Sequence, residues 1–407
     1  MVVLNHLYTR IVFPVLATVL LAWPGAAAAD DWRHKLRQGS QAGVARPQIV
    51  EPDSAFAYTG SFRSGYSSNA NEDFDPVPSA YSESAHDLEL SRKDGDRVLG
   101  LLLRGSIDAA YAADILDYAD FETRATAAWE TASGGVNALA AGYRFEHDGG
   151  LRSHDVGASA TLRRQAGGRP VFTTLTVNTF THEDQQFFGL SLDRSDSDRL
   201  RTGFEQGVEL PAHGDFTPTV SVGAVDVRHA QSRDNLGFRR DSSAVFARAG
   251  VTVSGKGRLG GEAGVLLFHR RYSDPVFDDR TVLLPEAELT WTISDKTGLA
   301  FSYLADLEET PVYGASNQMT VTAALTLSHR LDDKHSLSAV VFDQRDSYFE
   351  TDLEERTRGA GLELTRKLNE TLALSLAGEF EHATASGVDE AADTWKFSLG
   401  LITAFSK

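Results

Sequence analysis

From residue 54 onward, short turn signals divide the chain at regular intervals. Each is rich in Gly, Asp, Asn or Ser, and they lie at 94–96, 133–135, 166–168, 213–215, 254–257, 294–296, 331–334 and 368–370. Longer polar segments alternate with them, at 64–83, 109–117, 146–153, 183–197, 229–240, 271–280, 306–317, 346–356 and 383–393. Eight turns and nine loops make seventeen connections, so the pattern predicts about eighteen strands in up-and-down order.

The segments between these signals carry an apolar residue at every second position. The clearest are 120–131, 283–293, 318–328, 371–381 and the last stretch, 394–407. A period of two predicts a strand with one apolar face, and these runs exceed the roughly five or six residues usual in soluble sheets. In a soluble sandwich the same apolar face would lie in a protein core. Repeated charges on the opposite face instead favour a barrel with a wet interior.

Aromatic residues also lie near the predicted strand ends. Trp129, Trp291 and Phe216 are close to short turns, and Tyr272, Tyr348 and Trp395 are close to long loops, which predicts two aromatic girdles. We therefore predict an all-β protein in the outer membrane of a Gram-negative envelope. Residues 54–407 would form a transmembrane antiparallel up-and-down β-barrel of about eighteen strands with both termini periplasmic. At that size the interior would hold a channel unless loops fold inward.

The start of the chain is typical of a secretory signal peptide, which we assign to residues 1–29. Arg10 precedes an apolar run over 11–23, and Ala27, Ala28 and Ala29 form a small-residue cleavage pattern. The alternative is a transmembrane anchor, for which the run is short. Residues 30–53 are polar and aperiodic, and we interpret them as a periplasmic leader.

Composition excludes several classes of function. The chain has no cysteine, which excludes cysteine nucleophiles, thiolate metal sites and disulfides. A formal net charge of −18 argues against a nucleic-acid partner. No Gly-rich phosphate loop leads from a strand into a helix, so we predict no nucleotide cofactor.

Charged residues on the less apolar strand faces are the candidate site residues. The lumen-facing candidates are Glu122, Arg124, Arg144, Arg248, Glu262, Arg270, Glu286, Glu288, Glu363, Glu379 and Glu381. One interpretation is that they orient a polar or sugar solute in the lumen. The other is that they form cross-strand charge ladders that stiffen a wide barrel, and the two roles are compatible.

We predict no catalytic residue, no cofactor and no metal site, and hence no enzyme. The histidines His147, His154, His182 and His229 lie at loop edges near acids or serines, which leaves a rim hydrolase as a weaker alternative. Acidic groups at 193–198 and 352–355 could bind calcium, but we interpret them as solvated, charged loops.

Four segments carry a resemblance to a known family: SGYSSNANED, RRYSDPVFDDRTVLLPEAELTWTISDK, SYLADLEETPVYGASN and FDQRDSYFETDLEERTRGAGLELTRKLNETLALSLAGEFEHATASG. With them, residues 54–407 resemble an outer-membrane β-barrel porin family whose genes often lie beside those for exopolysaccharide synthesis and export. The resemblance implies an outer-membrane protein that forms, or assists, the route of a secreted polysaccharide.

The partners expected on this basis are outer-membrane lipid, the barrel assembly machinery through the C-terminal strand, and a polysaccharide or polysaccharide export proteins. The main alternative is a non-conducting surface scaffold or adhesin, whose long loops at 64–83 and 183–197 would bind a partner.

Overall fold

The structure is a computed structural model. It describes residues 56–69, 78–94, 97–110, 115–130, 135–148, 151–183, 185–187, 190–192, 197–254, 258–310, 315–386 and 391–406. The predicted signal peptide (1–29) and leader (30–53) lie outside these residues. Within the described part, no helix has the length and apolar character needed to cross a bilayer.

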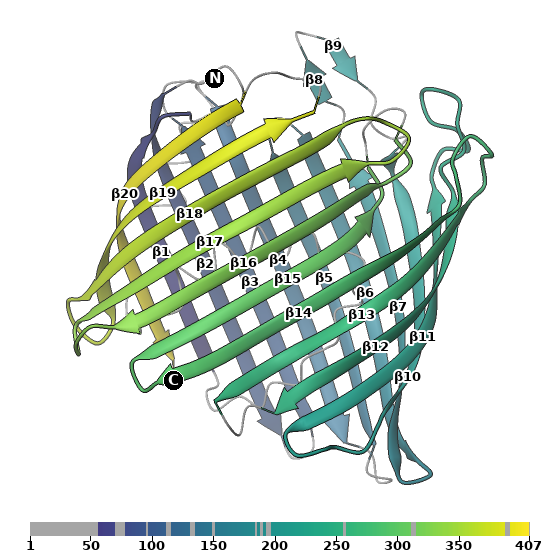
Figure 1. Cartoon of the computed structure of the whole chain (residues 1–407), viewed down its shortest axis with the longest axis horizontal. Helices are drawn as coiled ribbons and strands as arrows, with labels where there is room; N and C mark the ends of the chain where they lie inside the picture. Colours follow the sequence, from purple (N-terminus) through teal and green to yellow (C-terminus); the bar gives the residue numbers. More distant parts are fainter. Residues whose placement is uncertain are drawn as a thin grey trace.

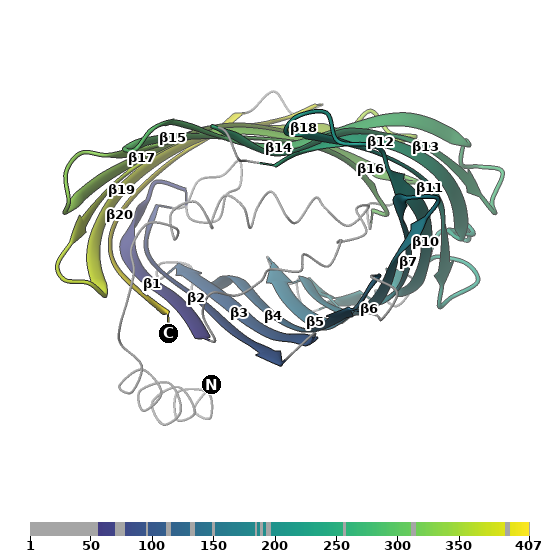
Figure 2. The same cartoon turned by 90° about the horizontal axis from the view of Figure 1, so that it is seen from below.

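Eighteen strands of the described chain form one closed antiparallel sheet. They are β1 (Phe56–Ser67), β2 (Ser79–Asp94), β3 (Arg97–Ala110), β4 (Ile115–Glu130), β5 (Val136–Asp148), β6 (Leu151–Ala166), β7 (Arg169–His182), β10 (Arg199–Glu209), β11 (Phe216–His229), β12 (Ser242–Ser254), β13 (Leu259–Tyr272), β14 (Arg280–Ser294), β15 (Thr297–Glu308), β16 (Gln318–Arg330), β17 (His335–Tyr348), β18 (Glu354–Lys367), β19 (Leu372–Ala385) and β20 (Ala391–Ser406). Each strand pairs with its neighbours in the chain, and β20 pairs with β1. Seen from below, the ring is a flattened oval (Figure 2).

Each of the eight predicted turns and nine predicted loops overlaps one connection between consecutive barrel strands, so the predicted strand count and topology are confirmed. The prediction of a long loop at 146–153 is wrong, because β5 ends at Asp148 and β6 begins at Leu151, and these two residues pair. The turn between β6 and β7 shows the local chemistry. Gly167 and Gly168 have φ angles of 59° and 75°, the left-handed values that a two-residue hairpin turn of this kind needs. The loop between β7 and β10 contains a small hairpin, β8 (Gln185–Phe187) with β9 (Leu190–Leu192), beyond the barrel rim (Figure 1).

The last strand closes the barrel as predicted. Strand β20 pairs with β1 from Ala57 opposite Ser406 to Ser67 opposite Lys396. Its apolar side chains face outward, with Phe397 56% and Leu399 61% exposed. The start of β1 and the end of β20 therefore lie at the same rim, which is the rim of the short turns (Figure 1).

One seam of the wall is incomplete. The β14–β15 ladder ends at Glu286 opposite Leu304. The Thr292 amide donates to the Arg258 carbonyl, on the β13 side of β14. Backbone amides alternate in direction along a strand, so an amide at position 285 would point toward β15. Proline has no N–H to donate. Beyond this point 280–285 stay paired with β13 and 305–308 with β16, and the two strands separate toward the long-loop rim (Figure 1).

The separated end of the seam is closed by a small apolar core. The inner faces of β11–β14 supply the buried side chains Val225, Val227, Ala244, Leu266, Phe268 and Leu284. Ala305 and Leu307, which lie on the outer face of β15, pack against them, and Leu307 is 0% exposed. The end of β15–β16 therefore overlaps the inner face of β11–β14, and the wall has two layers there.

Two predictions about outward-facing residues are wrong at this rim. Met319 and Val321, predicted on an apolar face like that of Leu325, pack against the apolar core instead of facing lipid. Tyr272 and Tyr348, predicted in an aromatic girdle, point inward. The Tyr272 hydroxyl donates to Asn317, and Tyr348, 9% exposed, donates to a carboxylate of β18.

Candidate functional site

The inner face of the barrel is the candidate site, because strand alternation collects the charged side chains there. All eleven predicted lumen-facing residues lie on the strand face opposite to the exposed apolar side chains. In β14, for example, Glu286 and Glu288 alternate with Leu283 and Trp291, which are 62% and 48% exposed on the outside.

Several of these residues form local ion pairs. Arg124 Nη2 lies 2.7 Å from Glu122 Oε1, and Arg248 Nε lies 3.4 Å from Glu286 Oε1. Arg144 Nε lies 3.0 Å from Asp120 Oδ1. The pairs that remain in contact with water, such as Arg124 with Glu122, contribute little each, roughly 0 to 1 kcal/mol, so they stiffen the wall only modestly. They leave an inner surface with both signs of charge.

A buried ion pair crosses the closing seam. Arg63 on β1 reaches Glu363 on β18, with Nη2 3.4 Å from Oε1 and side chains only 6% and 7% exposed. The bridge passes over β20 and β19, where the intervening inner residues are small. A Cβ added at Gly400 would lie 2.8 Å from Arg63 Cγ and 2.7 Å from Ser375 Oγ. Gly400 therefore makes room for the arginine that ties the first strand to the last three.

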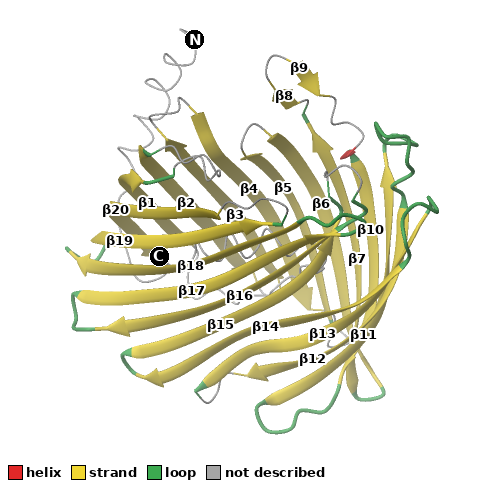
Figure 3. Cartoon of the chain, turned by 45° about the horizontal axis from the view of Figure 1, so that its top comes forward, coloured by secondary structure: helices red, strands yellow, loops and turns green. Residues whose placement is uncertain are grey.

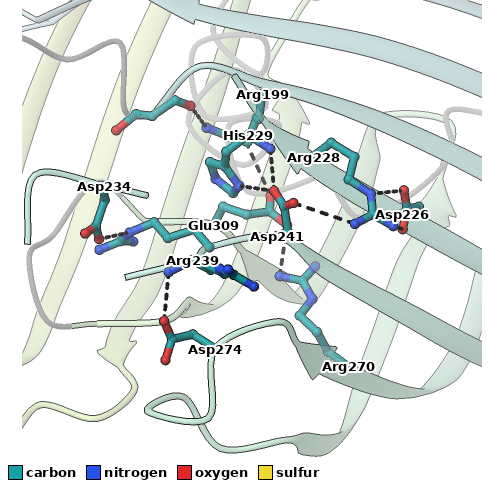
Figure 4. Close-up of polar contacts among 12 residues, drawn as sticks. Arg199, Asp226, Arg228, His229, Asp234, Arg239, Asp241, Arg270, Asp274 and Glu309 are labelled. Atoms are coloured by element: carbon teal, nitrogen blue, oxygen red, sulfur yellow. Dashed lines mark hydrogen bonds and ion pairs between the residues drawn. The ribbon is translucent and has the colours of Figure 1, made fainter. Parts of the chain in front are cut away.

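A second group of arginines holds the end of the β15–β16 hairpin, of which the structure describes residues 309–310 and 315–317 between the strands; we call these residues the tip. Arg270 Nη1 lies 2.9 Å from Glu309 Oε1, and Arg199 Nε lies 3.7 Å from Glu309 Oε2 (Figure 4). The Arg199 guanidinium also stacks over Phe180, 4.5 Å from the ring centroid. Burial alone would raise the pKa of Glu309, but the positive charges of Arg270, Arg201 and Arg199 lower it to about 2. Glu309 is therefore ionised at neutral pH.

The rest of the tip is fixed from neighbouring strands and loops. Arg240 Nη1 donates to the carbonyl oxygens of Thr310 and Ala315, at 3.0 and 3.1 Å. Arg270 Nη1 also donates to Asn317 Oδ1 at 2.7 Å. Arg280 lies 2.8 Å from Glu350, whose carboxylate accepts the Ser316 amide at 3.0 Å. Side chains, and not a backbone ladder with β14, thus hold this tip in place.

The rim histidines are not gathered into one site. His154 Nε2 lies 3.2 Å from Glu183, His182 Nδ1 lies 3.5 Å from Asp198, and His229 Nδ1 lies 3.6 Å from Asp241. Strand alternation places His154 on the outer face and His182 on the inner face. His147 lies opposite Arg152 in the β5–β6 ladder.

A metal site is not visible in the part of the chain that the structure describes, where no group of three or more His, Asp or Glu side chains could hold an ion. Of the acidic groups considered for calcium, residues 193–196 lie outside that part.

Sequence reasoning missed Arg199, Arg201 and Glu309. The first two do carry a signal, because Arg199, Arg201 and Glu205 alternate with the exposed residues Leu200 and Phe204. Glu309 carries no such signal in the sequence, since its partners Arg199 and Arg270 lie on strands distant in sequence.

No curated protein gives a significant match. Among solved structures, the chain is similar to the ferric enterobactin receptor PfeA of Pseudomonas aeruginosa, with 10% identity over 86% of this chain and 82% of that one and a TM-score of 0.45. The siderophore receptor PirA of Acinetobacter baumannii gives 7% identity over 87% and 81%, with a TM-score of 0.42. The FrpB iron transporter of Neisseria meningitidis gives 7% identity over 84% and 66%, with a TM-score of 0.44.

The family comparison covers most of the barrel. The model of the family described as "Putative beta-barrel porin 2" matches residues 107–404. That range runs from within β3 to near the end of β20, through all strands between them. The chain therefore belongs to this porin family and is an outer-membrane β-barrel of porin-like architecture.

Proposed function

We propose that this porin-like barrel serves exopolysaccharide export, as the channel or as an accessory component of it. The observation that supports the proposal is the closed wall of eighteen strands with a polar, charged inner face. Barrels of this size enclose space well beyond what their own side chains fill. The resemblance to porins encoded beside polysaccharide genes gives the class of solute.

The inner face suits a polymer that must move. Charged side chains in local pairs, such as Arg248 with Glu286 and Arg124 with Glu122, offer donors and acceptors to sugar hydroxyls at many weak sites. Conduction needs binding that favours entry and still allows exit. Those of the eleven predicted residues that are not buried would then orient the chain of sugars. The protein's partners would be the barrel assembly machinery, outer-membrane lipid and polysaccharide export proteins.

The proposal is tested in two measurements. Purified protein in a planar bilayer should conduct ions, and addition of the cognate polymer on the periplasmic side should block the current. Deletion of the gene should lower secreted polysaccharide, and the wild-type gene should restore it. A barrel without conductance, in a strain whose secreted polysaccharide is unchanged by the deletion, would refute the proposal.

A matched pair of variants links the current to the inner face. Arg248→Ala removes an inner charge, and Val245→Ala changes the outer face of the same strand, where Val245 is 58% exposed. Only the first should alter the ion selectivity of the current. Equal selectivity in both would show that the current does not pass this wall.

A surface scaffold is the second candidate, and the β8–β9 hairpin favours it. This hairpin stands outside the barrel wall at the long-loop rim (Figure 3). If the protein is a scaffold, deletion of 183–197 should abolish attachment to a partner surface and leave permeability unchanged.

A further inference from the structure

The arginines around Glu309 have more donors than the protein fills. Arg201 and Arg270 are 6% and 1% exposed. Among the described residues, Arg201 Nη1 and Arg270 Nη2 are buried without a hydrogen-bond partner. A buried donor left without a partner is energetically unfavourable, and more so in a charged group. Donor capacity therefore remains at this point of the inner wall.

The carboxylate that occupies these arginines fits them incompletely. Glu309 Oε1 is 2.9 Å from Arg270 Nη1 but makes no hydrogen bond of good geometry, and Arg199 stays 3.7 Å from Oε2. Arginine binds a carboxylate best through two parallel N–H···O bonds. A freely oriented carboxylate could use the unfilled donors of Arg201 and Arg270, which Glu309 does not use.

The segment that carries Glu309 lies beyond the continuous backbone ladder of the wall. Above Glu286 and Leu304, β14 and β15 share no ladder, so the end of β15–β16 is held to β14 only by side chains. Loss of the contacts at Glu309 removes one set of these side-chain contacts, while those of Arg240 and Arg280 and the apolar core remain and the backbone ladders stay closed. Local loosening of this kind costs less than global unfolding.

We propose that Arg199, Arg201 and Arg270 form a binding site for the carboxylate of an acidic sugar, and that Glu309 occupies it as an internal competitor. The acidic sugar displaces the Glu309 carboxylate from these arginines, which weakens the attachment of the end of β15–β16. This inference rests on the proposed function and narrows its substrate class to uronate-containing polysaccharides. Glu308, Asp306 and Asp155 are acidic neighbours of the same arginines, so the selectivity of the site comes from the donors that Arg201 and Arg270 leave unfilled.

Binding to the detergent-solubilised full chain tests the inference. The probe is tetragalacturonate, the neutral comparison is maltotetraose, and affinities are measured by titration calorimetry. Glu309→Gln removes the internal competitor and should tighten tetragalacturonate binding on the order of tenfold, the scale of a typical coupling between two ligands. Arg201→Met should weaken binding by a similar factor. Glu209→Gln makes the same charge change at the other end of β10 and should leave the affinity unchanged.

The outcomes separate this inference from the proposed function. Unchanged affinity in Glu309→Gln, or equal binding of maltotetraose, overturns the inference. Inorganic sulfate that binds as tightly as tetragalacturonate also overturns it, because the site would then select no sugar. Heat-modifiable migration on gels shows whether each variant is folded, and Arg201→Lys is the second variant should Arg201→Met fail to fold. Specific binding in a protein whose gene deletion leaves secreted polysaccharide unchanged would refute the export function and leave the site standing.

Discussion

Leu307→Ala directly tests the two-layer closure of the β14–β15 seam. Leu307 lies on the outer face of β15 and is 0% exposed, since it packs against the inner faces of neighbouring strands. Truncation of a fully buried leucine to alanine costs about 2 to 5 kcal/mol. The β14–β15 ladder ends at Leu304, so no backbone hydrogen bonds to β14 hold Leu307. The lost free energy therefore weakens the packing of the strand end against the inner faces of β11–β14. A loss of about 3 kcal/mol raises the open population roughly hundredfold.

Amide hydrogen exchange in detergent micelles measures that population. Peptides covering 303–321 should exchange on the order of a hundredfold faster in Leu307→Ala, while peptides from β17 and β18 keep the wild-type rate. Leu325→Ala is the matched control, because Leu325 lies on the outer face of β16 and is 39% exposed to the surroundings. Equal exchange in the two variants, or no change in Leu307→Ala, would refute the overlap of the layers.

Two further predictions concern the seam and one periplasmic turn. The cysteine-free chain allows disulfide trapping: Glu286→Cys with Leu304→Cys, the last facing pair, should oxidise readily, whereas Leu284→Cys with Asp306→Cys, the next pair of a continuous ladder, should not. Formation of the second disulfide would show an unbroken seam. In the turn between β16 and β17, hydrogen bonds from the Lys334 amide and from the ring and amide of His335 lower the pKa of Asp332 from 3.8 to about 2. This contribution is present above pH 3.8 and is lost as the pH falls to about 2, so Asp332→Asn should lower the melting temperature at pH 7 and match wild type near pH 2. A melting difference that persists unchanged near pH 2 would contradict this.

The strand count could be predicted from sequence because its signals are local. A turn such as Gly167-Gly168 requires left-handed φ values that few other residues adopt, so the two glycines alone indicate the turn in the sequence. The alternation in β14 or β20 fixes which residues share a face without any knowledge of neighbours. The pairing of β20 with β1 follows once the strands alternate in direction and their number is even.

The error at Tyr272 was avoidable from the same alternation. Arg270 is predicted to face the lumen, and Tyr272, two residues later in the same strand, must share that face. The girdle assignment used only the distance from a loop, which says nothing about the direction of a side chain. Glu309 differs, because its partners Arg199 and Arg270 come from strands that only the closed barrel brings near it.

Two unusual features of the sequence indicate the incomplete β14–β15 seam, and each accounts for the other. Pro285 lies inside a predicted central strand, where proline belongs only at an edge or an interruption, and a closed barrel has no edge. Phe268 and Leu284 are apolar residues at inner-face positions, where a wet lumen favours polar ones. An interrupted ladder exposes backbone groups that the membrane cannot satisfy, so protein must cover it. The inner apolar residues supply that cover by binding the end of β15–β16, and the wall exchanges backbone hydrogen bonds for side-chain packing at this one seam. A seam held in that way responds to a ligand that competes for its side chains, which a continuous ladder does not.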